Sequence, residues 1–173
     1  MSSTAHNYCL DANVLIQAWQ KYYSPDFCPD YWTILNELGQ QGRIFIPEEV
    51  KNEVIVKDES EKTEDDLSKW LKRSSIPIHK PTEDVIRCWQ KILQANPLHK
   101  LLVDNIKGRS LADPWLISHA MSNNATVVTK ENLETAMNTK RIKIPNVCEN
   151  MGIRWIDDFT FVKELGIKFS CKI

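Results

Sequence analysis

The fold is decided by the stretch Tyr8-Cys9-Leu10-Asp11-Ala12-Asn13-Val14-Leu15-Ile16. Its first three residues are apolar or nearly so, and they predict a short buried strand that ends at Asp11. An apolar run that favours a helix follows from Asn13 onward. Open α/β sheets bind ligands outside the carboxyl ends of their strands, and a helix N-terminus favours an anion. Asp11 is therefore predicted either to cap the helix or to be held ionised in a crevice as a metal ligand.

Length and composition indicate an ordinary globular protein. The 173 residues suffice for one domain with a full hydrophobic core, and we expect a single domain over residues 1–173. The net charge of −1 gives no global sign of nucleic-acid binding, although local basic patches remain compatible with it.

Cysteine usage and hydropathy indicate an intracellular protein. The five cysteines are scattered and form no C-x-x-C pair, which is a poor disulfide framework and a poor zinc site. Reduced thiols in a cytoplasmic protein are the simpler interpretation. The first seven residues lack the basic start and apolar region of a signal peptide, and no apolar run is long enough to cross a bilayer.

Strand and helix patterns alternate along the chain. After the first strand, short β-branched or apolar runs predict strands at Arg43–Ile46, Ile76–Ile78, Thr126–Thr129 and Ile153–Ile156, with a short extended piece at Ile142–Pro145. Helices are expected at Val14–Tyr23, Pro29–Leu38, Glu48–Val56, Asp65–Arg73, Thr82–Leu93, Ala112–Met121, Asn132–Met137 and Asp157–Leu165. Strands separated by helices predict an α/β fold with three layers, in which helices cover both faces of a mostly parallel sheet.

Three further acids have surroundings similar to those of Asp11. Glu53 lies on the helix after the second strand, Asp113 opens an apolar helix, and Glu131 follows the strand that ends at Thr129. The carboxyl ends of parallel strands meet at one edge of the sheet, so Asp11 and Glu131 are expected there together. Gathered carboxylates without histidine or cysteine suit Mg²⁺ or Mn²⁺, which relieves their mutual repulsion.

Four motifs in order resemble the acidic motifs of the PIN nuclease domain. They are Leu10-Asp11-Ala12-Asn13, Ile46-Pro-Glu-Glu-Val-Lys-Asn-Glu53-Val, Ser110-Leu-Ala-Asp113-Pro-Trp-Leu-Ile and Val127-Val-Thr129-Lys-Glu131. The tail Lys143-Ile-Pro-Asn-Val-Cys-Glu-Asn-Met-Gly-Ile153, ending near Leu165-Gly-Ile-Lys-Phe169, is similar to a prokaryotic PIN-like family, DUF4411. The resemblance covers Tyr8 to Phe169.

This resemblance implies an α/β/α fold and a Mg²⁺- or Mn²⁺-dependent ribonuclease, often the toxin of a toxin–antitoxin pair. Carried over by position, the catalytic and metal-binding residues would be Asp11, Glu53, Asp113 and Glu131, with Asn13 and Thr129 as polar supports. The implied partners are RNA, an antitoxin protein and a second copy of the chain. Many PIN proteins carry Asp where Glu131 stands, and Glu49 competes with Glu53 for the second position.

Simpler interpretations remain for several of these residues. Asp113 before Pro114 is also a plausible N-cap, Glu53 is an ordinary helix glutamate without the motif, and Glu131 opens the next predicted helix. His119 is expected to be packed or on the surface rather than catalytic, and the six tryptophans are interpreted as core. The candidates for phosphate contacts are Lys100, Lys107 and Arg109.

The sequence is also compatible with two rival functions. One is a catalytically impaired PIN-like module that binds RNA or a partner, which the Glu131 departure permits. The other is a haloacid-dehalogenase-type phosphatase, whose first strand also ends in an acid. That enzyme class normally needs a second Asp two residues later, and Asn13 stands there instead.

Overall fold

A parallel sheet forms the centre of the computed structural model, which describes residues 6–55, 65–103, 111–136 and 141–170. Its five strands have the order β3-β2-β1-β4-β5, and every pairing is parallel. The strands are β1 (Tyr8–Leu10), β2 (Ile44–Pro47), β3 (Ile78–His79), β4 (Thr126–Val128) and β5 (Trp155–Ile156). The predicted parallel sheet is confirmed, and β1 lies at its centre.

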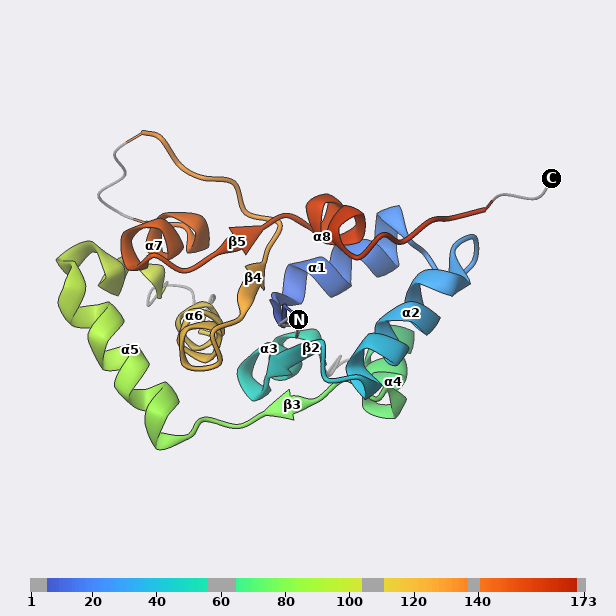
Figure 1. Ribbon diagram of the computed structural model, residues 1–173, viewed down its shortest axis with the longest axis horizontal. Coiled ribbons are helices and arrows are strands. Elements are labelled where there is room, and N and C mark those ends of the chain that lie inside the picture. The colour runs from blue at the N-terminus through green and yellow to red at the C-terminus, as the bar shows by residue number, and fades with distance from the viewer. Residues whose placement is uncertain (1–5, 56–64, 104–110, 137–140, 171–173) are drawn as a thin grey trace, which may run out of the picture.

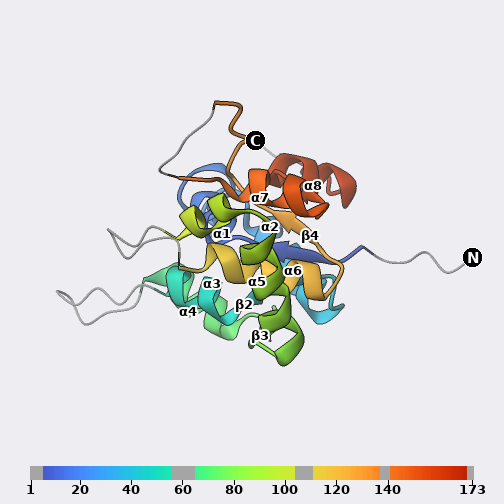
Figure 2. The same cartoon turned by 90° about the vertical axis from the view of Figure 1, so that its left-hand side faces the viewer.

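Helices cover both faces of this sheet (Figure 1). One layer contains α5 (Glu83–Ala95), α6 (Asp113–Ser122) and α7 (Ile144–Met151), and Figure 2 views the molecule from this side. The other layer contains α1 (Ala12–Gln17), α2 (Pro29–Gln40), α4 (Asp66–Arg73) and α8 (Asp158–Glu164). Helix α3 (Glu48–Val54) directly follows β2 and contacts both α1 and α6. The predicted three-layer α/β fold is confirmed.

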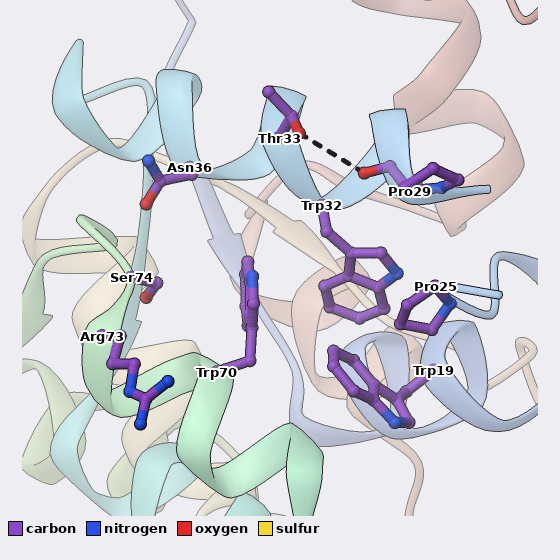
Figure 3. Close-up of a pocket in the computed structure, with 9 residues that line it drawn as sticks. All are labelled: Trp19, Pro25, Pro29, Trp32, Thr33, Asn36, Trp70, Arg73 and Ser74. Carbon is purple, nitrogen blue, oxygen red and sulfur yellow. Dashed lines mark hydrogen bonds between the residues drawn. The ribbon is translucent and has the colours of Figure 1, made fainter.

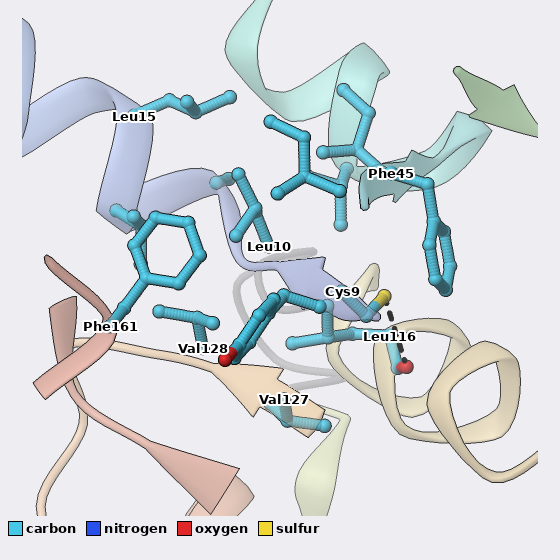
Figure 4. Close-up of a cluster of buried hydrophobic side chains, with 14 of the residues drawn as sticks. Cys9, Leu10, Leu15, Phe45, Leu116, Val127, Val128 and Phe161 are labelled. Carbon is cyan, nitrogen blue, oxygen red and sulfur yellow. Dashed lines mark hydrogen bonds between the residues drawn. The ribbon is translucent and has the colours of Figure 1, made fainter. Parts of the chain in front are cut away.

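The first strand is buried on both faces because it lies between these layers. Cys9 packs toward α6, where its thiol donates to the Leu116 carbonyl at 3.7 Å (Figure 4). Leu10 belongs to the same buried cluster, together with Leu15 of α1 and Phe161 of α8. A strand without a solvent face needs a continuous apolar run, which the sequence before Asp11 supplies.

Side-chain caps set the starts of three helices. The carboxylate of Asp65 accepts from the Ser68 N–H at 2.7 Å, and that of Asp157 accepts from the Thr160 N–H at 2.6 Å. The Thr82 hydroxyl accepts from the Val85 N–H at 3.4 Å. Each bond satisfies a backbone donor that a helix N-terminus otherwise leaves free.

Two sequence predictions near the carboxyl terminus are wrong. Residues Ile142–Pro145, predicted as extended, instead lead into α7, because Pro145 is tolerated in a first helical turn. No helix forms over residues 132–136, the described part of the predicted Asn132–Met137 helix. There the Asn146 side chain accepts from the Glu134 N–H at 3.0 Å and donates to its carbonyl at 2.8 Å, replacing helical hydrogen bonds.

The first predicted helix is also interrupted. Beyond Gln17 it continues as a π-helical turn, η1 (Ala18–Tyr22), rather than as α-helix to Tyr23. Within the described ranges, no helix has the length and apolar character needed to span a bilayer. The predicted phosphate contacts Lys107 and Arg109 lie outside the described residues.

Helix α2 approaches the chain before β3 so closely that only glycine fits at the contact. A Cβ atom at Gly39 would lie 2.8 Å from the backbone N and Cα of Ile76. We expect Gly39→Ala to lower the free energy of unfolding by about 1–3 kcal/mol through overpacking. In an uncrowded helix the same change would stabilise by about 1 kcal/mol, so the sign of the change is diagnostic. Urea unfolding followed by circular dichroism measures it, with exposed Glu37→Ala on the same helix as the control; a stabilised Gly39→Ala would contradict the packing.

Candidate functional site

Asp11 and Thr129 meet at the carboxyl ends of the two central strands. Leu10 pairs with Val128 in the parallel ladder, so the next residue of each strand comes to the same height. The ladder continues there, since the Asp11 N–H donates to the Val128 carbonyl at 3.0 Å. The Thr129 hydroxyl then donates to the Asp11 carboxylate at 2.9 Å. Both side chains are buried, with Asp11 only 2% exposed.

The charge of Asp11 is poorly compensated by its surroundings. Burial raises the pKa of this carboxyl to about 7, and the hydrogen bond from Thr129 opposes the rise. The negative charges of Glu131 and Glu53 raise the pKa further, and the backbone amide of Asn13 lowers it least. Carboxylates from three separate elements therefore act on one another at this edge, which is the situation that a cation relieves.

Capping alone does not account for Asp11. The residue occupies the N-cap position of α1, where the Asn13 amide acts weakly on its carboxylate without forming a full capping hydrogen bond. Asn13 lies on the exposed side of the first turn of α1, where its side chain has no hydrogen-bond partner among the described residues. Asp11 therefore stands at the N-cap position with its carboxylate bonded to Thr129.

Glu53 reaches the start of α6, where Asp113 stands. Its carboxylate accepts from the Ala112 N–H at 3.4 Å, one residue before Asp113. Burial raises the pKa of Glu53, and this backbone hydrogen bond lowers it. Asp113 is the first residue of α6 and is 8% exposed. The charge of Glu53 raises the pKa of Asp11, whereas the pKa of the Glu49 carboxyl is raised mainly by its own burial.

The charge of Glu131 raises the pKa of Asp11, and its carboxylate oxygens bind the start of α7 and nearby basic residues. One oxygen accepts from the Arg141 guanidinium at 3.2 Å and lies 3.6 Å from the Lys143 ammonium. The other accepts from the backbone N–H of Ile144, the first residue of α7, at 2.8 Å. The Glu131 N–H donates in turn to the Thr129 hydroxyl at 3.2 Å. Both carboxylate oxygens thus have partners, and Glu131 ties α7 to the end of β4.

The described acids do not form a closed metal cage. Among the residues that the structure describes, no three His, Cys, Asp or Glu side chains form a group that could hold a metal ion. Mg²⁺ does not require such a cage, since it keeps several waters and binds through one or two carboxylates. The Asp11 carboxylate, on which the charges of Glu131 and Glu53 act, is a hard oxygen donor of the kind that Mg²⁺ or Mn²⁺ prefers.

A buried ion pair supports the same strand end and was missed from the sequence. The Lys130 ammonium lies 2.8 Å from the Asp158 carboxylate, and this pair is largely buried. The ammonium also sits 4.4 Å from the ring centroid of Tyr22 and 4.6 Å from that of Phe159. Cation–π contacts of this kind stabilise a desolvated ammonium. Lys130 therefore anchors the residue between Thr129 and Glu131 to α8.

The remaining predicted residues lie apart from the acids. Lys100 is exposed on the 3₁₀ helix η2 (Pro97–Leu102). His119 is buried, and burial lowers its pKa to about 4, so it is packed as a neutral ring. Trp19, Trp32 and Trp70 pack edge to face and wall a hollow of about 410 Å³ between η1, α2 and α4, with no carboxylate in its lining (Figure 3).

The raised pKa of Asp11 predicts a pH-dependent cost of burying its charge. The folded protein holds this proton more tightly than the unfolded chain, so stability should fall as pH rises from about 4 to about 7. In EDTA, Asp11→Asn should be more stable than the wild type by about 2–4 kcal/mol at pH 8, and equal to it near pH 4. Urea unfolding at both pH values measures the difference, with exposed Glu37→Gln as the control. A wild type as stable as Asp11→Asn at pH 8 would contradict the uncompensated site.

The contacts of Glu131 predict a structural role for its carboxylate. Glu131→Ala removes the carboxylate that accepts from the Ile144 N–H and pairs with Arg141 and Lys143. This change should lower the free energy of unfolding by about 1–3 kcal/mol. Glu131→Gln keeps an acceptor for Ile144 and should lose less. Thermal and urea unfolding of both variants test this order. Equal stability of Glu131→Ala and wild type would show that the carboxylate does not hold α7.

Comparison with solved structures shows the fold. A chain of VapBC2 from Rickettsia felis, solved bound to a DNA fragment from its promoter, aligns over 87% of this chain and 97% of its own with a TM-score of 0.57 and 19% identity. A chain of VapBC-1 from nontypeable Haemophilus influenzae aligns over 87% and 96% with a TM-score of 0.48 and 18% identity. No curated protein sequence matches this chain. The first alignment confirms the PIN-like α/β fold.

The sequence itself identifies the family. The family model described as a domain of unknown function, DUF4411, matches residues 8–169. That range includes every acid of the site and the helices that hold them. The protein therefore belongs to the DUF4411 family, as its motifs predict.

Proposed function

We propose that this protein is a Mg²⁺- or Mn²⁺-dependent endoribonuclease. The observation that carries the proposal is the buried Asp11, whose pKa is raised to about 7 by burial and by the charges of Glu131 and Glu53. A carboxylate kept in this state costs folding free energy, and a functional site is where such a cost is usually found. The family resemblance and the PIN-like fold support the same activity.

Each residue has a role that follows from its position. Asp11, Asp113 and Glu53 would hold the metal, and Thr129 fixes the Asp11 carboxylate by its hydrogen bond. A bound divalent metal lowers the pKa of a coordinated water and stabilises charge on a phosphodiester. Glu131, with both oxygens engaged by α7 and its basic residues, holds the edge of the site and reaches the metal only by exchanging those partners. Asn13 stands at the exposed rim.

RNA is the proposed substrate, and the proposed setting is a toxin–antitoxin pair. The solved complex with the similar fold is VapBC2, so an antitoxin-like protein is the partner that we propose for this chain. A second copy of the chain is a further proposed partner. The proposed location is the cytoplasm, where scattered cysteines such as those of this sequence stay reduced.

Cleavage of a single-stranded RNA tests the activity. Wild type should cut with Mn²⁺ or Mg²⁺ and lose the activity in EDTA, whereas Asp11→Asn should be slower by at least about 100-fold with either metal. Asp11→Asn keeps the size of the side chain and an acceptor for Thr129, so the loss reports on the charge. Asp30→Asn, an exposed carboxylate in the first turn of α2, is the matched control and should cut as wild type.

Metal binding is read independently from thermal unfolding. Mn²⁺ should raise the unfolding temperature of the wild type and leave that of Asp11→Asn unchanged. If Mn²⁺ stabilises only the wild type and no RNA is cut, the chain is the binding module that the engaged Glu131 permits. Turnover of an aryl phosphate without RNA cleavage would identify a phosphatase instead.

A further inference from the structure

A small hollow is lined in part by Arg141, the residue whose guanidinium donates to Glu131. It has a volume of about 280 Å³ and is lined by the start of η2, by residues 134–136 and 141–142, and by α7. Leu98 and Ile142 supply apolar surface, and Asn150 and Glu134 supply polar groups. Ligand pockets for drug-sized molecules start near 300 Å³, so this hollow is the size for one flat heterocycle.

Arg141 joins this hollow to the acid site. Its guanidinium lines the hollow and donates to Glu131 at 3.2 Å through one nitrogen. Arg has five N–H donors, so most of them stay available to an anion at the mouth of the hollow. Lys143 lies beside it, 3.6 Å from the same Glu131 oxygen. Arg141 and Lys143 thus share a single carboxylate, that of Glu131.

Asn150 is oriented by a buried histidine. The Nδ1 atom of His99 lies 2.6 Å from the Ile92 carbonyl, which is only an acceptor, so Nδ1 carries the proton. The Nε2 atom of His99 is then an acceptor, and the Asn150 amide nitrogen donates to it at 3.0 Å. The amide oxygen of Asn150 is left without a partner among the described residues and serves as a fixed acceptor in the hollow.

We propose that this hollow binds one base of the RNA strand, with the phosphate beside that base held by Arg141 and Lys143 next to the acids. The inference rests on the proposed function for the identity of the ligand. RNA is read through unstacked bases that are hydrogen-bonded on their edges, and apolar side chains support their faces. Leu98, which is 40% exposed, and Ile142 supply that support.

The polar lining predicts which bases fit. The Asn150 oxygen and the Glu134 carboxylate are both acceptors, and one Glu134 oxygen already accepts from the Ala136 N–H at 3.3 Å. Acceptors favour bases that carry an exocyclic amino group, namely adenine, cytosine and guanine. Uracil presents carbonyl oxygens at the corresponding positions and should be disfavoured.

Binding of labelled single-stranded oligoribonucleotides in EDTA tests the proposal without needing a metal or cleavage. Arg141→Gln should weaken binding roughly tenfold and reduce the salt-dependence slope by about 0.7. Arg87→Gln removes the same charge from an exposed site on α5, where Arg87 pairs with Glu83 and Asp84, and should bind as wild type. Equal affinity of Arg141→Gln and wild type would overturn the phosphate site.

The base site is tested by sequence preference. Wild type should bind oligoadenylate and oligocytidylate about five- to tenfold more tightly than oligouridylate, and Asn150→Leu should lose that preference. Asn123→Leu, a change of the same kind at the end of α6, should keep it. A thermal-unfolding scan of each variant identifies any loss of folding, and in that case Asn150→Ala is measured instead. Equal affinity of wild type for all three oligonucleotides would overturn the base site.

The two proposals fail in different ways. If the wild type cuts RNA while Arg141→Gln binds normally, the nuclease stands and the subsite is wrong. If binding depends on Arg141 and Asn150 but no metal supports cleavage, the subsite stands and the nuclease is wrong.

Discussion

The buried, uncompensated carboxylate of Asp11 is the constraint on which the rest of the site depends. Burying a charge without a partner is costly, and here the neighbouring charges that act on Asp11 are also negative. The fold tolerates this because the Asp11 backbone is fixed by the β4 ladder and one oxygen is bonded to Thr129. An arrangement that loses stability at neutral pH in the absence of a cation is one that a cation can stabilise strongly.

The three consecutive residues after β4 each bind a different neighbouring element. Thr129 holds Asp11, Lys130 forms the buried pair with Asp158 of α8, and Glu131 holds the start of α7. Successive residues of an extended segment point in different directions, so each can serve a different neighbour. A shift of α1, α7 or α8 would therefore also shift the end of β4, which positions Asp11.

The layered fold could be predicted because its signals are local, while the errors arose where distant contacts decide. Apolar runs, alternating elements and capping residues such as Thr82 and Asp157 are visible along the chain. The segment 132–136 has a helix-compatible sequence, yet the Asn146 side chain, remote in sequence, satisfies its backbone groups. Residues 142–145 look extended locally, and only the α7 start, with Glu131 bonded to Ile144, reveals a helix. Neither contact can be read from spacing.

The candidate site likewise contains residues that the sequence predicts and residues that only the fold reveals. The meeting of Asp11 and Thr129 follows from parallel strands ending at one edge, and Glu53 follows from its motif. The basic residues Arg141 and Lys143 were overlooked, although the run Lys140-Arg141-Ile142-Lys143 is visible, because only the fold places it against Glu131. Glu131 consequently belongs to two environments, since its charge acts on Asp11 while its oxygens hold cations. Any group that competes for Arg141 therefore also acts on the contacts by which Glu131 holds the start of α7.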